Sequence, residues 1–438
     1  MKKKCFIALM LTSTLALSAC TFNFNNNVND PSDKDNPSQN FAQVTPEEEN
    51  NDPNPVLELP GNNDVNDPAT NKPDEPEAIE EIDIDWKSIY ADFLNNEMDD
   101  IVGDDWQGYF VDYGLIYVNN DNVPELVLGG DCEATGNIVC TIIDGEVYSY
   151  HLSRLSFFYK EYSNYLDNAE GHMGYYFDDI LSIGEMGFET VFTGTYQEEL
   201  DEDYNYLGMV YEIGMQEVTE EEYDKAVDSY IPRDERMYWS KGCRLQDMLD
   251  YLEGNMASDY KEAYSKEIEA GIPLGYGDTA KYYSLVERDG ADPMLLVVGD
   301  SSFRILAFED GLLFYGPDWY VSEMASTSII GKTGIVENFY NFGEGADFGR
   351  YYIKNGTLTH NYGYAGRAYD DDGIEILDEY GNAVWNYTIN GIKVTEQEFT
   401  EEFISKYGNE KYISIVTAGY DSDMERFEKS EILDILNN

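Results

Sequence analysis

The sequence predicts an α+β fold in which one domain, made of a helix, antiparallel β-hairpins and a second helix, occurs in two tandem copies after a disordered tether. Three observations support this prediction. A strand-to-helix joint occurs twice, further sequence anchors recur in the same order, and strands follow one another as hairpins without regular alternation with helices. We place the first copy at residues 84–255 and the second at residues 256–438.

The repeated joint covers Tyr211–Tyr230 and Tyr387–Tyr407, with tyrosine and valine at matching positions. In each copy a short strand with a glycine turn leads to a threonine, Thr219 or Thr395, and a glutamate follows three residues later. Such a threonine accepts a hydrogen bond from a free amide of the helix start, while the glutamate binds back to the threonine amide. We therefore expect the same capping box at both helix starts.

Helices are predicted at both ends of the first copy. From Trp86–Val102, apolar residues recur at helical spacing with acidic residues between them. Leu245–Leu252 is the predicted closing helix, and Gly254 follows it as a helix end requires. The second copy repeats the order of the first. The segments that correspond to the opening helix, second strand, hairpin and closing helix are Tyr260–Tyr264, Pro293–Gly299, Asp310–Phe314 and Leu433–Leu436.

Strands are predicted between these helices. Tyr109–Val118 and Pro124–Leu128 are rich in aromatic, β-branched or other apolar residues and are separated by a polar turn. Ile138–Ile143 and Val147–Leu152 flank the dipeptide Asp144-Gly145, which is a strong hairpin signal. Tyrosine-rich segments follow as far as the repeated joint. The order of elements therefore favours antiparallel sheets.

The first 19 residues resemble the signal peptide of bacterial lipoproteins. Lys2–Lys4 precede the apolar run Cys5–Leu17, which is too short to span a membrane. Ser18 and Ala19 come directly before Cys20, as in the lipobox, whose cysteine receives a diacylglyceryl group before cleavage. The resemblance implies a lipid anchor at Cys20 on the extracytoplasmic face of the cell membrane. The alternative is an ordinary signal peptide with an incidental cysteine.

Residues 20–83 are predicted to form the disordered tether. The segment after Cys20 holds nine of the chain's 14 prolines, and it has almost no aromatic residue after Phe41. With so little apolar surface to bury, it cannot offset the entropy lost on ordering. We expect a spacer that holds the folded part away from the membrane.

The composition restricts the partners of the chain. It carries 27 basic and 87 acidic residues, for a formal net charge of −60. Such a charge repels nucleic-acid phosphates and anionic membrane surfaces, so we expect no nucleic-acid partner. The hydrophobic content of 42% is sufficient for folded cores beyond the tether.

Two motifs resemble those of surface lipoproteins from Gram-positive anaerobic bacteria, a family whose functions are largely unknown. Its members often carry a hairpin of the type Asp-x-Asp-x-Asp-Gly-x-Pro-Glu-Leu, and here Tyr117–Leu126 is a degenerate version. Tyr117 replaces the first aspartate, and Asn122 replaces the glycine. The second motif is a helix entry of the type Val-Thr-Glu-x-Glu-Tyr, found at Val218–Tyr223. The resemblance covers most of residues 84–438 and implies no mechanism.

The degenerate hairpin loop is the candidate metal site. Asn119, Asp121 and Glu125 place oxygen atoms around a tight turn, as a hard cation such as Ca²⁺ requires. The alternative is a polar β-turn between two core strands, and we expect no cofactor unless this loop binds Ca²⁺. The corresponding loop Glu287–Met294 contains an arginine and lacks the glutamate. Asp370–Glu375 is a further acidic loop, which solvent exposure explains equally well.

Three cysteines remain once Cys5 leaves with the signal peptide and Cys20 is lipidated. They are Cys132, Cys140 and Cys243. Cys132 and Cys140 flank a predicted turn and could form a disulfide across it. Three buried reduced thiols are the alternative, because an odd number of cysteines leaves at least one unpaired.

No catalytic motif is evident. The only histidines are His151, His172 and His360. None belongs to a His-Glu-x-x-His helix, and the chain has no Gly-x-Ser-x-Gly turn. A catalytic pair of Cys140 with His151 is conceivable, but a structural role for both is favoured. A glycosidase needs only two carboxylates, and among 87 acidic residues no pair stands out. Trp239, Trp319 and Trp385 suit sugar stacking, although we expect most such rings to pack the sheets.

Three functions remain. The favoured one is a non-enzymatic, surface-displayed lipoprotein that acts as a binding or structural module. It would contact the membrane through its lipid anchor and an unknown extracellular ligand or protein. The first alternative is a secreted hydrolase that acts on glycans. The second is the substrate-binding lipoprotein of a transporter, a class that usually alternates strands and helices in two lobes.

Overall fold

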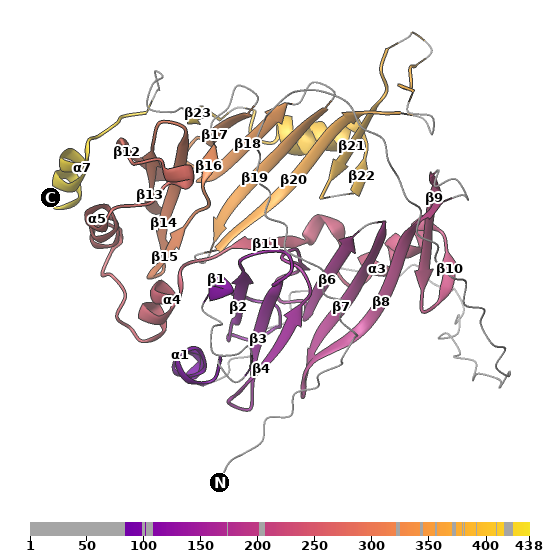
Figure 1. Ribbon diagram of the computed structural model, residues 1–438, viewed down its shortest axis with the longest axis horizontal. Coiled ribbons are helices and arrows are strands. Elements are labelled where there is room, and N and C mark those ends of the chain that lie inside the picture. The colour runs from indigo at the N-terminus through magenta and orange to yellow at the C-terminus, as the bar shows by residue number, and fades with distance from the viewer. Residues whose placement is uncertain are drawn as a thin grey trace, which may run out of the picture. The chain divides into compact units, whose positions relative to one another are not determined.

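The chain forms antiparallel β-sheets with a few helices, which confirms the predicted α+β class (Figure 1). The computed structural model describes residues 84–438 except 99–100, 102–107, 173, 201–205, 321–324, 342–344, 355–356, 370–373, 379, 381, 391, 409 and 416–423. The predicted signal peptide, the lipidation site Cys20 and the tether at residues 20–83 lie outside the described residues. No helix within the described residues has both the length and the apolar character needed to cross a membrane.

One helix and a four-stranded sheet open the described chain. Helix α1 (Trp86–Asn96) begins at Asp85, whose side chain accepts a hydrogen bond from the Ser88 amide. Asp144 and Gly145 both have positive φ in the turn between the last two strands, as the hairpin signal predicts. The strands are β1 (Phe110–Ile116), β2 (Glu125–Gly130), β3 (Asn137–Ile143) and β4 (Glu146–Leu152), paired antiparallel in chain order.

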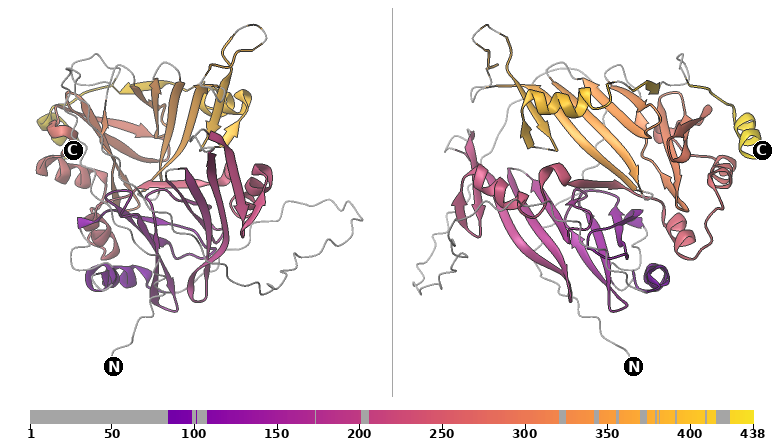
Figure 2. Two further views of the ribbon diagram at one scale, coloured as in Figure 1. Left: turned by 45° about the vertical axis from the view of Figure 1, so that its right-hand side comes forward. Right: turned by 180° about the vertical axis from the view of Figure 1, so that it is seen from behind.

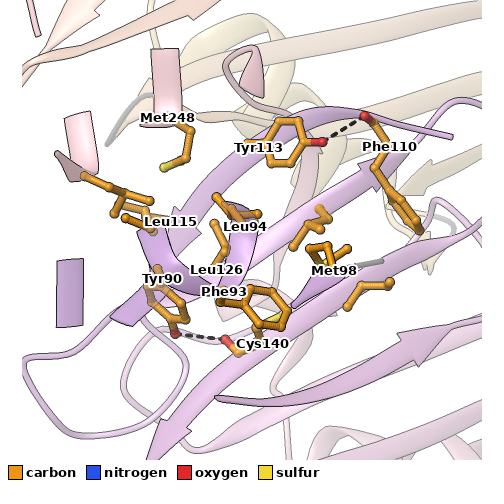
Figure 3. Packing of buried hydrophobic residues seen from close by; sticks show 14 of the residues in the cluster. Tyr90, Phe93, Leu94, Met98, Phe110, Tyr113, Leu115, Leu126, Cys140 and Met248 are labelled. Carbon is orange, nitrogen blue, oxygen red and sulfur yellow. Dashed lines mark hydrogen bonds between the residues drawn. The ribbon is translucent and has the colours of Figure 1, made fainter. Parts of the chain in front are cut away.

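Helix α1 packs its apolar face on this sheet (Figure 3). Tyr90 and Phe93 are buried there, and the Tyr90 hydroxyl donates a hydrogen bond to the Cys140 carbonyl over 3.1 Å. Helix α1 ends at Asn96, and beyond Glu97 the residues Met98 and Ile101 of the predicted stripe Trp86–Val102 are helical again.

A longer antiparallel meander follows. Its strands are β5 (Phe158–Tyr159), β6 (Tyr165–His172), β7 (Tyr175–Gly184), β8 (Gly187–Leu200), β9 (Tyr206–Ile213) and β10 (Gln216–Val218). Helix α3 (Glu220–Asp228) then lies on β8 and β9, where the Tyr223 ring contacts those of Tyr196 and Tyr211. The elements that close this half are η2 (Arg233–Glu235), β11 (Met237–Lys241) and α4 (Leu245–Leu252).

The second half has a similar order of elements. It begins with α5 (Tyr260–Ala270), η3 (Gly275–Gly277) and a five-stranded sheet of β12 (Tyr282–Arg288), β13 (Ala291–Val298), β14 (Ser302–Glu309), β15 (Leu312–Tyr315) and β16 (Trp319–Tyr320). The long strands are β17 (Ala325–Ile330), β18 (Ile335–Asn341), β19 (Gly345–Lys354), β20 (Thr357–Arg367), β21 (Trp385–Ile389) and β22 (Ile392–Val394). The last elements are α6 (Glu396–Thr400), which continues as the π-helical turn Glu401–Ser405, then β23 (Tyr412–Ile415) and α7 (Lys429–Leu436).

Strand β11 joins the long strands of both halves into one fourteen-stranded sheet. It pairs antiparallel with β5 on one side and with β20 on the other. Shortly after β11, the Cys243 backbone bridges Tyr113 in β1 and Phe314 in β15, so it also links the two smaller sheets. The predicted domain boundary after residue 255 falls between α4 and α5, and it stays a prediction because the halves share these contacts.

Both predicted capping boxes are confirmed. The Thr219 hydroxyl accepts from the Glu222 amide, while the Glu222 carboxylate accepts from the Thr219 amide over 3.0 Å. Thr395 and Glu398 make the same two bonds at the start of α6. The view from behind in Figure 2 shows α3 and α6 on the same face of the fourteen-stranded sheet. The repeated sequence joint thus gives the same local structure at both places.

Replacing either capping threonine with alanine should destabilise the chain by about 1 kcal/mol, because one helix-start amide loses its acceptor. We expect Thr219→Ala and Thr395→Ala to have similar effects on the free energy of unfolding, measured by urea denaturation. Thr279→Ala, at an exposed position between η3 and β12, is a control outside both caps. An effect at only one cap would contradict the equivalence of the two joints.

Candidate functional site

A cavity of about 290 Å³ lies where β11 separates from β20. Trp239 pairs with Thr359 on β20, whereas the two residues before Trp239 pair with β5. We call the space at this separation the fork cavity. The residues that line it are Glu235, Arg236, Met237, Tyr238, Tyr352, Thr359, His360 and Asn361. The cavity therefore draws residues from both halves of the chain.

Trp239 fixes the position of β11. Its side chain is buried, and its ring stacks on that of Phe157 with the centroids 6.0 Å apart. A β-carbon added at Gly129 would lie 2.4 Å from the tryptophan ring, so this close contact requires glycine. Because side chains alternate along a strand, Tyr238 points to the opposite face from Trp239. The packed tryptophan thus holds Tyr238 at the cavity.

Tyr238 and His360 form the aromatic part of the wall. Their ring centroids are 4.4 Å apart in an edge-to-face arrangement, and the Tyr238 hydroxyl lies 3.0 Å from Ser156 Oγ. Burial lowers the pKa of His360 to about 4, so its ring is neutral at pH 7. Its Nδ1 atom is buried and has no hydrogen-bond partner among the described residues. The histidine therefore provides a neutral polar group beside the cavity.

The charged residues of the wall already have partners of opposite charge. Glu235 lies 2.7 Å from Lys160 Nζ. The Arg236 guanidinium lies 3.7 Å from Asp167 and 3.8 Å from Asp228. The cavity consequently presents aromatic and neutral polar groups rather than an uncompensated charge.

The size and chemistry of the fork cavity fit a small, neutral polar molecule. Ligand pockets usually span about 300–1,000 Å³, so this cavity, at about 290 Å³, lies just below that range. Tyr238 and Tyr352 supply aromatic surface, and Asn361 supplies an amide. Among the described side chains that line the cavity, Glu235 carries the one carboxyl group, whereas glycosidases use two carboxyl groups about 5–10 Å apart.

The candidate metal ligands lie together in the loop before β2. Asn119 Oδ1 accepts from the Asp121 amide over 3.3 Å, and Asp121 Oδ1 accepts from the Val123 amide over 2.8 Å. Glu125 is buried, and its carboxylate accepts from the Val118 amide over 2.7 Å. These bonds belong to a polar turn that satisfies its own backbone. Within the described residues, no group of three or more histidine, cysteine, aspartate or glutamate side chains is placed to hold a metal.

The electrostatics of Glu125 also differ from those of an exposed calcium ligand. Burial raises its pKa to about 8, and the nearby negative charge of Asp121 adds to the shift. At pH 7 the protonated form of Glu125 therefore predominates. A cation would have to displace this proton, so binding at the loop would strengthen as pH rises.

The other two candidate loops are placed differently. In the loop Glu287–Met294, Glu287 pairs with Lys332 Nζ at 2.5 Å and Met294 is fully buried. Asp370–Gly373 of the second acidic loop lie outside the described residues. Glu375, at the end of that loop, pairs with Arg367 over 2.8 Å.

The three remaining cysteines are free thiols in the structure. Cys140 and Cys243 are buried, whereas Cys132 is exposed, so the structure does not form the predicted Cys132–Cys140 disulfide. The turn places the Cys132 sulfur 3.4 Å from Thr135 Oγ1. Cys140 instead belongs to the core beneath α1. The alternative of three buried thiols holds for two of them.

The register of β3 and β4 makes Cys140 and His151 diagonal neighbours, but the Cys140 side chain is buried in the core whereas the His151 ring is exposed. His151 is exposed on β4, opposite Ile138, and its Nε2 atom lies 2.6 Å from the Thr135 carbonyl oxygen. The side chain of the remaining histidine outside the fork cavity, His172, lies outside the described residues. Trp239 and Trp319 pack in the sheets, as expected, whereas Trp385 is 39% exposed.

Two buried aspartates near the cavity were not recognised in the sequence. Asp167 on β6 is fully buried and Asp178 on β7 is 9% exposed. The only sequence signal is an acidic residue inside each strand segment, and strands with one solvated face contain such residues routinely. Their burial depends on α3, which follows more than 40 residues later.

No protein-family model matches this chain, and neither a curated protein nor a solved structure matches it.

Proposed function

We propose that this chain is a lipid-anchored protein displayed on the outer face of a cell membrane, where it binds a small extracellular ligand. The observation that carries the binding role is the fork cavity, whose aromatic and neutral polar wall comes from both halves of the chain. The lipobox at Cys20 and the proline-rich segment after it support the location. The family resemblance of the hairpin and helix-entry motifs supports the same address.

The proposal includes a tandem duplication, in which residues 84–255 and 256–438 are copies of one α+β domain. The order of elements supports it, because a small meander, a long meander, a capped helix, a return strand and a closing helix occur in each half. The pairing also supports it. Gly194 lies opposite Ile213 in the first half, and Gly363 lies opposite Ile389 in the second.

Both alternative functions have less support. A glycan hydrolase needs two carboxyl groups, and among the described side chains that line the fork cavity Glu235 supplies one. A transporter substrate-binding protein usually has strands alternating with helices, whereas the strands here pair antiparallel. The binding role therefore fits best.

A ligand screen on the full chain tests the binding role. We expect one or more neutral monosaccharides or amino acids to raise the melting temperature, since a ligand that binds only the folded state stabilises it by about 2.7 kcal/mol at 100 times its Kd. Tyr238→Ala should abolish the shift. Tyr175→Ala removes a tyrosine that is 49% exposed elsewhere and should retain it. A screen without any shift, or a shift that persists in Tyr238→Ala, would reject the fork cavity as the binding site.

The anchor is tested separately. Cys20→Ser removes the thiol that accepts the lipid, so the protein should move from the membrane fraction to the soluble fraction in detergent partition. Two acyl chains anchor a protein stably, and nothing else in the proposal would retain it. Cys132→Ser removes an exposed thiol that has no part in the anchor, and it should leave partition unchanged. Retention of the Cys20→Ser variant in the membrane would contradict the proposal.

A further inference from the structure

Two aspartates meet on the sheet beneath α3. Asp167 on β6 pairs with Ile180, and Asp178 on β7 pairs with Ala169, so the two acidic side chains are diagonal neighbours on one face. The Tyr223 hydroxyl of α3 donates a hydrogen bond to Asp178 Oδ2 over 2.6 Å. The helix thus rests directly on this pair of carboxyl groups.

Asp167 lacks the donors that a buried carboxylate needs. Neither of its oxygens has a hydrogen-bond partner among the described residues, although the side chain is fully buried. The nearest cationic atom in an ion pair is Arg236 Nη1 at 3.7 Å. That guanidinium also donates from Nε to the Ile231 carbonyl and lies 3.8 Å from Asp228. An ionised Asp167 would therefore be poorly compensated.

In the second half of the chain, the carboxylate at the corresponding position has a cation close to it. Glu337 on β18 pairs with Arg350 on β19, as Asp167 pairs with Ile180. Arg350 places Nε 2.9 Å and Nη2 2.8 Å from Glu337 Oε2. Where Asp178 lies opposite a glycine of β8, Phe348 lies opposite the corresponding glycine of β20. One carboxylate and one cation beneath α6 thus replace the two carboxyl groups beneath α3.

Burial raises the pKa of Asp167 well above its usual value. The negative charge of Asp178 raises this pKa further, and Arg236 only partly opposes the shift. The titratable and charged groups around the pair are Asp178 and Asp179 on β7, Tyr196 on β8, Tyr211 on β9, Tyr223, Asp224 and Asp228 on α3, and Arg233 and Arg236 after α3. Arg233 pairs with Asp224 and Asp228, which leaves Arg236 as the cation near Asp167.

We propose that Asp167 and Asp178 hold one proton between them, and that loss of this proton loosens α3 and the segment 231–238. This segment carries Arg236 and Tyr238 to the wall of the fork cavity, so the pair links pH to the geometry of that wall. The expected pH dependence of ligand binding at the fork cavity rests on the proposed function, whereas the shared proton does not.

The direction of the pH effect follows from proton linkage. In the closed state, with α3 packed on the sheet, the aspartate pair holds a proton. In the opened state the aspartates are solvated and have a pKa near the ordinary value of about 3.9, so this proton is released at neutral pH. Opening therefore becomes easier as pH rises, by about tenfold per pH unit, until the raised pKa of Asp167 is passed. Below about pH 4 both states are protonated, and the effect disappears.

Hydrogen exchange of the full chain tests this inference. Above about pH 5, the opening constant of α3 should rise with pH relative to that of α6, by up to about tenfold per pH unit until the raised pKa of Asp167 is reached. The comparison with α6 cancels the intrinsic pH dependence of amide exchange. In Asp167→Asn the neutral amide removes the titration, so the rise should vanish while α3 stays protected. Parallel behaviour of α3 and α6 in the wild type, or an unchanged rise in Asp167→Asn, would overturn the proposal.

A second variant and a direct readout guard against a folding defect. Asp178→Asn should weaken the pH dependence without abolishing it, because burial still raises the pKa of Asp167 after the charge of Asp178 is removed. The infrared difference spectrum at pH 5 between wild type and Asp167→Asn should contain the C=O stretch of a protonated carboxylic acid. Glu337→Gln should leave that band in place. Absence of the band, or a Ca²⁺- or Na⁺-dependent stabilisation lost in Asp167→Asn, would show that no shared proton is present. If Asp167→Asn loses the pH dependence but the screen finds no ligand, the proposed function is rejected and the shared proton of Asp167 and Asp178 is still supported.

Discussion

Replacing Trp239 with alanine should lower the free energy of unfolding of the full chain by about 3–5 kcal/mol, the usual effect of removing a large aromatic side chain from a core. The side chain is 2% exposed and stacks on Phe157. It lies within contact distance of Gly114 and Gly129, which leave the space for its ring. Few local groups are positioned to refill that space, because neither glycine has a side chain to move.

The position of Trp239 makes this substitution a test of the connection between the two halves. Its strand is the one that pairs with both β5 and β20. We expect urea denaturation of Trp239→Ala to show the full loss in the free energy of unfolding. We also expect Tyr238 to lose its fixed position at the fork cavity. Trp385→Ala is the matched control, since that tryptophan is 39% exposed and a surface substitution is usually within about 0.5 kcal/mol. Equal effects of the two substitutions would show that β11 is not held by its tryptophan.

The sequence was most informative where structure depends on neighbours along the chain. The Asp144-Gly145 and Asp310-Gly311 turns have the positive φ angles that their residues favour, and both join antiparallel strands. The capping boxes at Thr219 and Thr395 also formed as expected. In each case the decisive bonds connect residues within a few positions of one another.

Strand β11 shows where such reasoning ends. Four of its five residues pair with β5 or with β20, which lie far from it in the sequence. Nothing in the segment Met237–Lys241 identifies those partners, because β-propensity describes a surface to be covered and not the strand that covers it. The fork cavity exists only because of this pairing, so its residues could not be collected from the sequence.

The predicted metal loop and the buried aspartates show the same limit for charged residues. Asn119, Asp121 and Glu125 have the spacing of cation ligands, yet in the structure their oxygens accept backbone amides of the same loop. Asp167 has no unusual spacing, and its properties depend on burial beneath a helix that follows much later. Composition could not distinguish acidic residues that accept backbone amides from an acidic residue that is buried beneath a helix, since one residue in five is acidic here.

Replacing Arg350 with methionine should destabilise the chain by about 3–5 kcal/mol, because it leaves a largely buried carboxylate without its cation. Arg350 is fully buried, and Glu337 is 16% exposed. The guanidinium also donates to the Phe403 carbonyl over 2.8 Å and to the Glu402 carbonyl, at the turn that continues α6. These carbonyls lose their donor in the variant, which adds to the loss.

A double substitution separates the charge effect from the packing effect. In Arg350→Met combined with Glu337→Leu, no buried charge remains, so much of the stability should return. In the first half we expect a change of opposite sign in the free energy of unfolding. Asp167→Asn removes a poorly compensated acid and should stabilise the chain at pH 7. Urea denaturation of the two single variants, the double variant and Asp167→Asn measures all four values. A loss in the double variant equal to the sum of the single losses would show that Glu337 and Arg350 act independently, and a destabilised Asp167→Asn would show that Asp167 is compensated as well as Glu337.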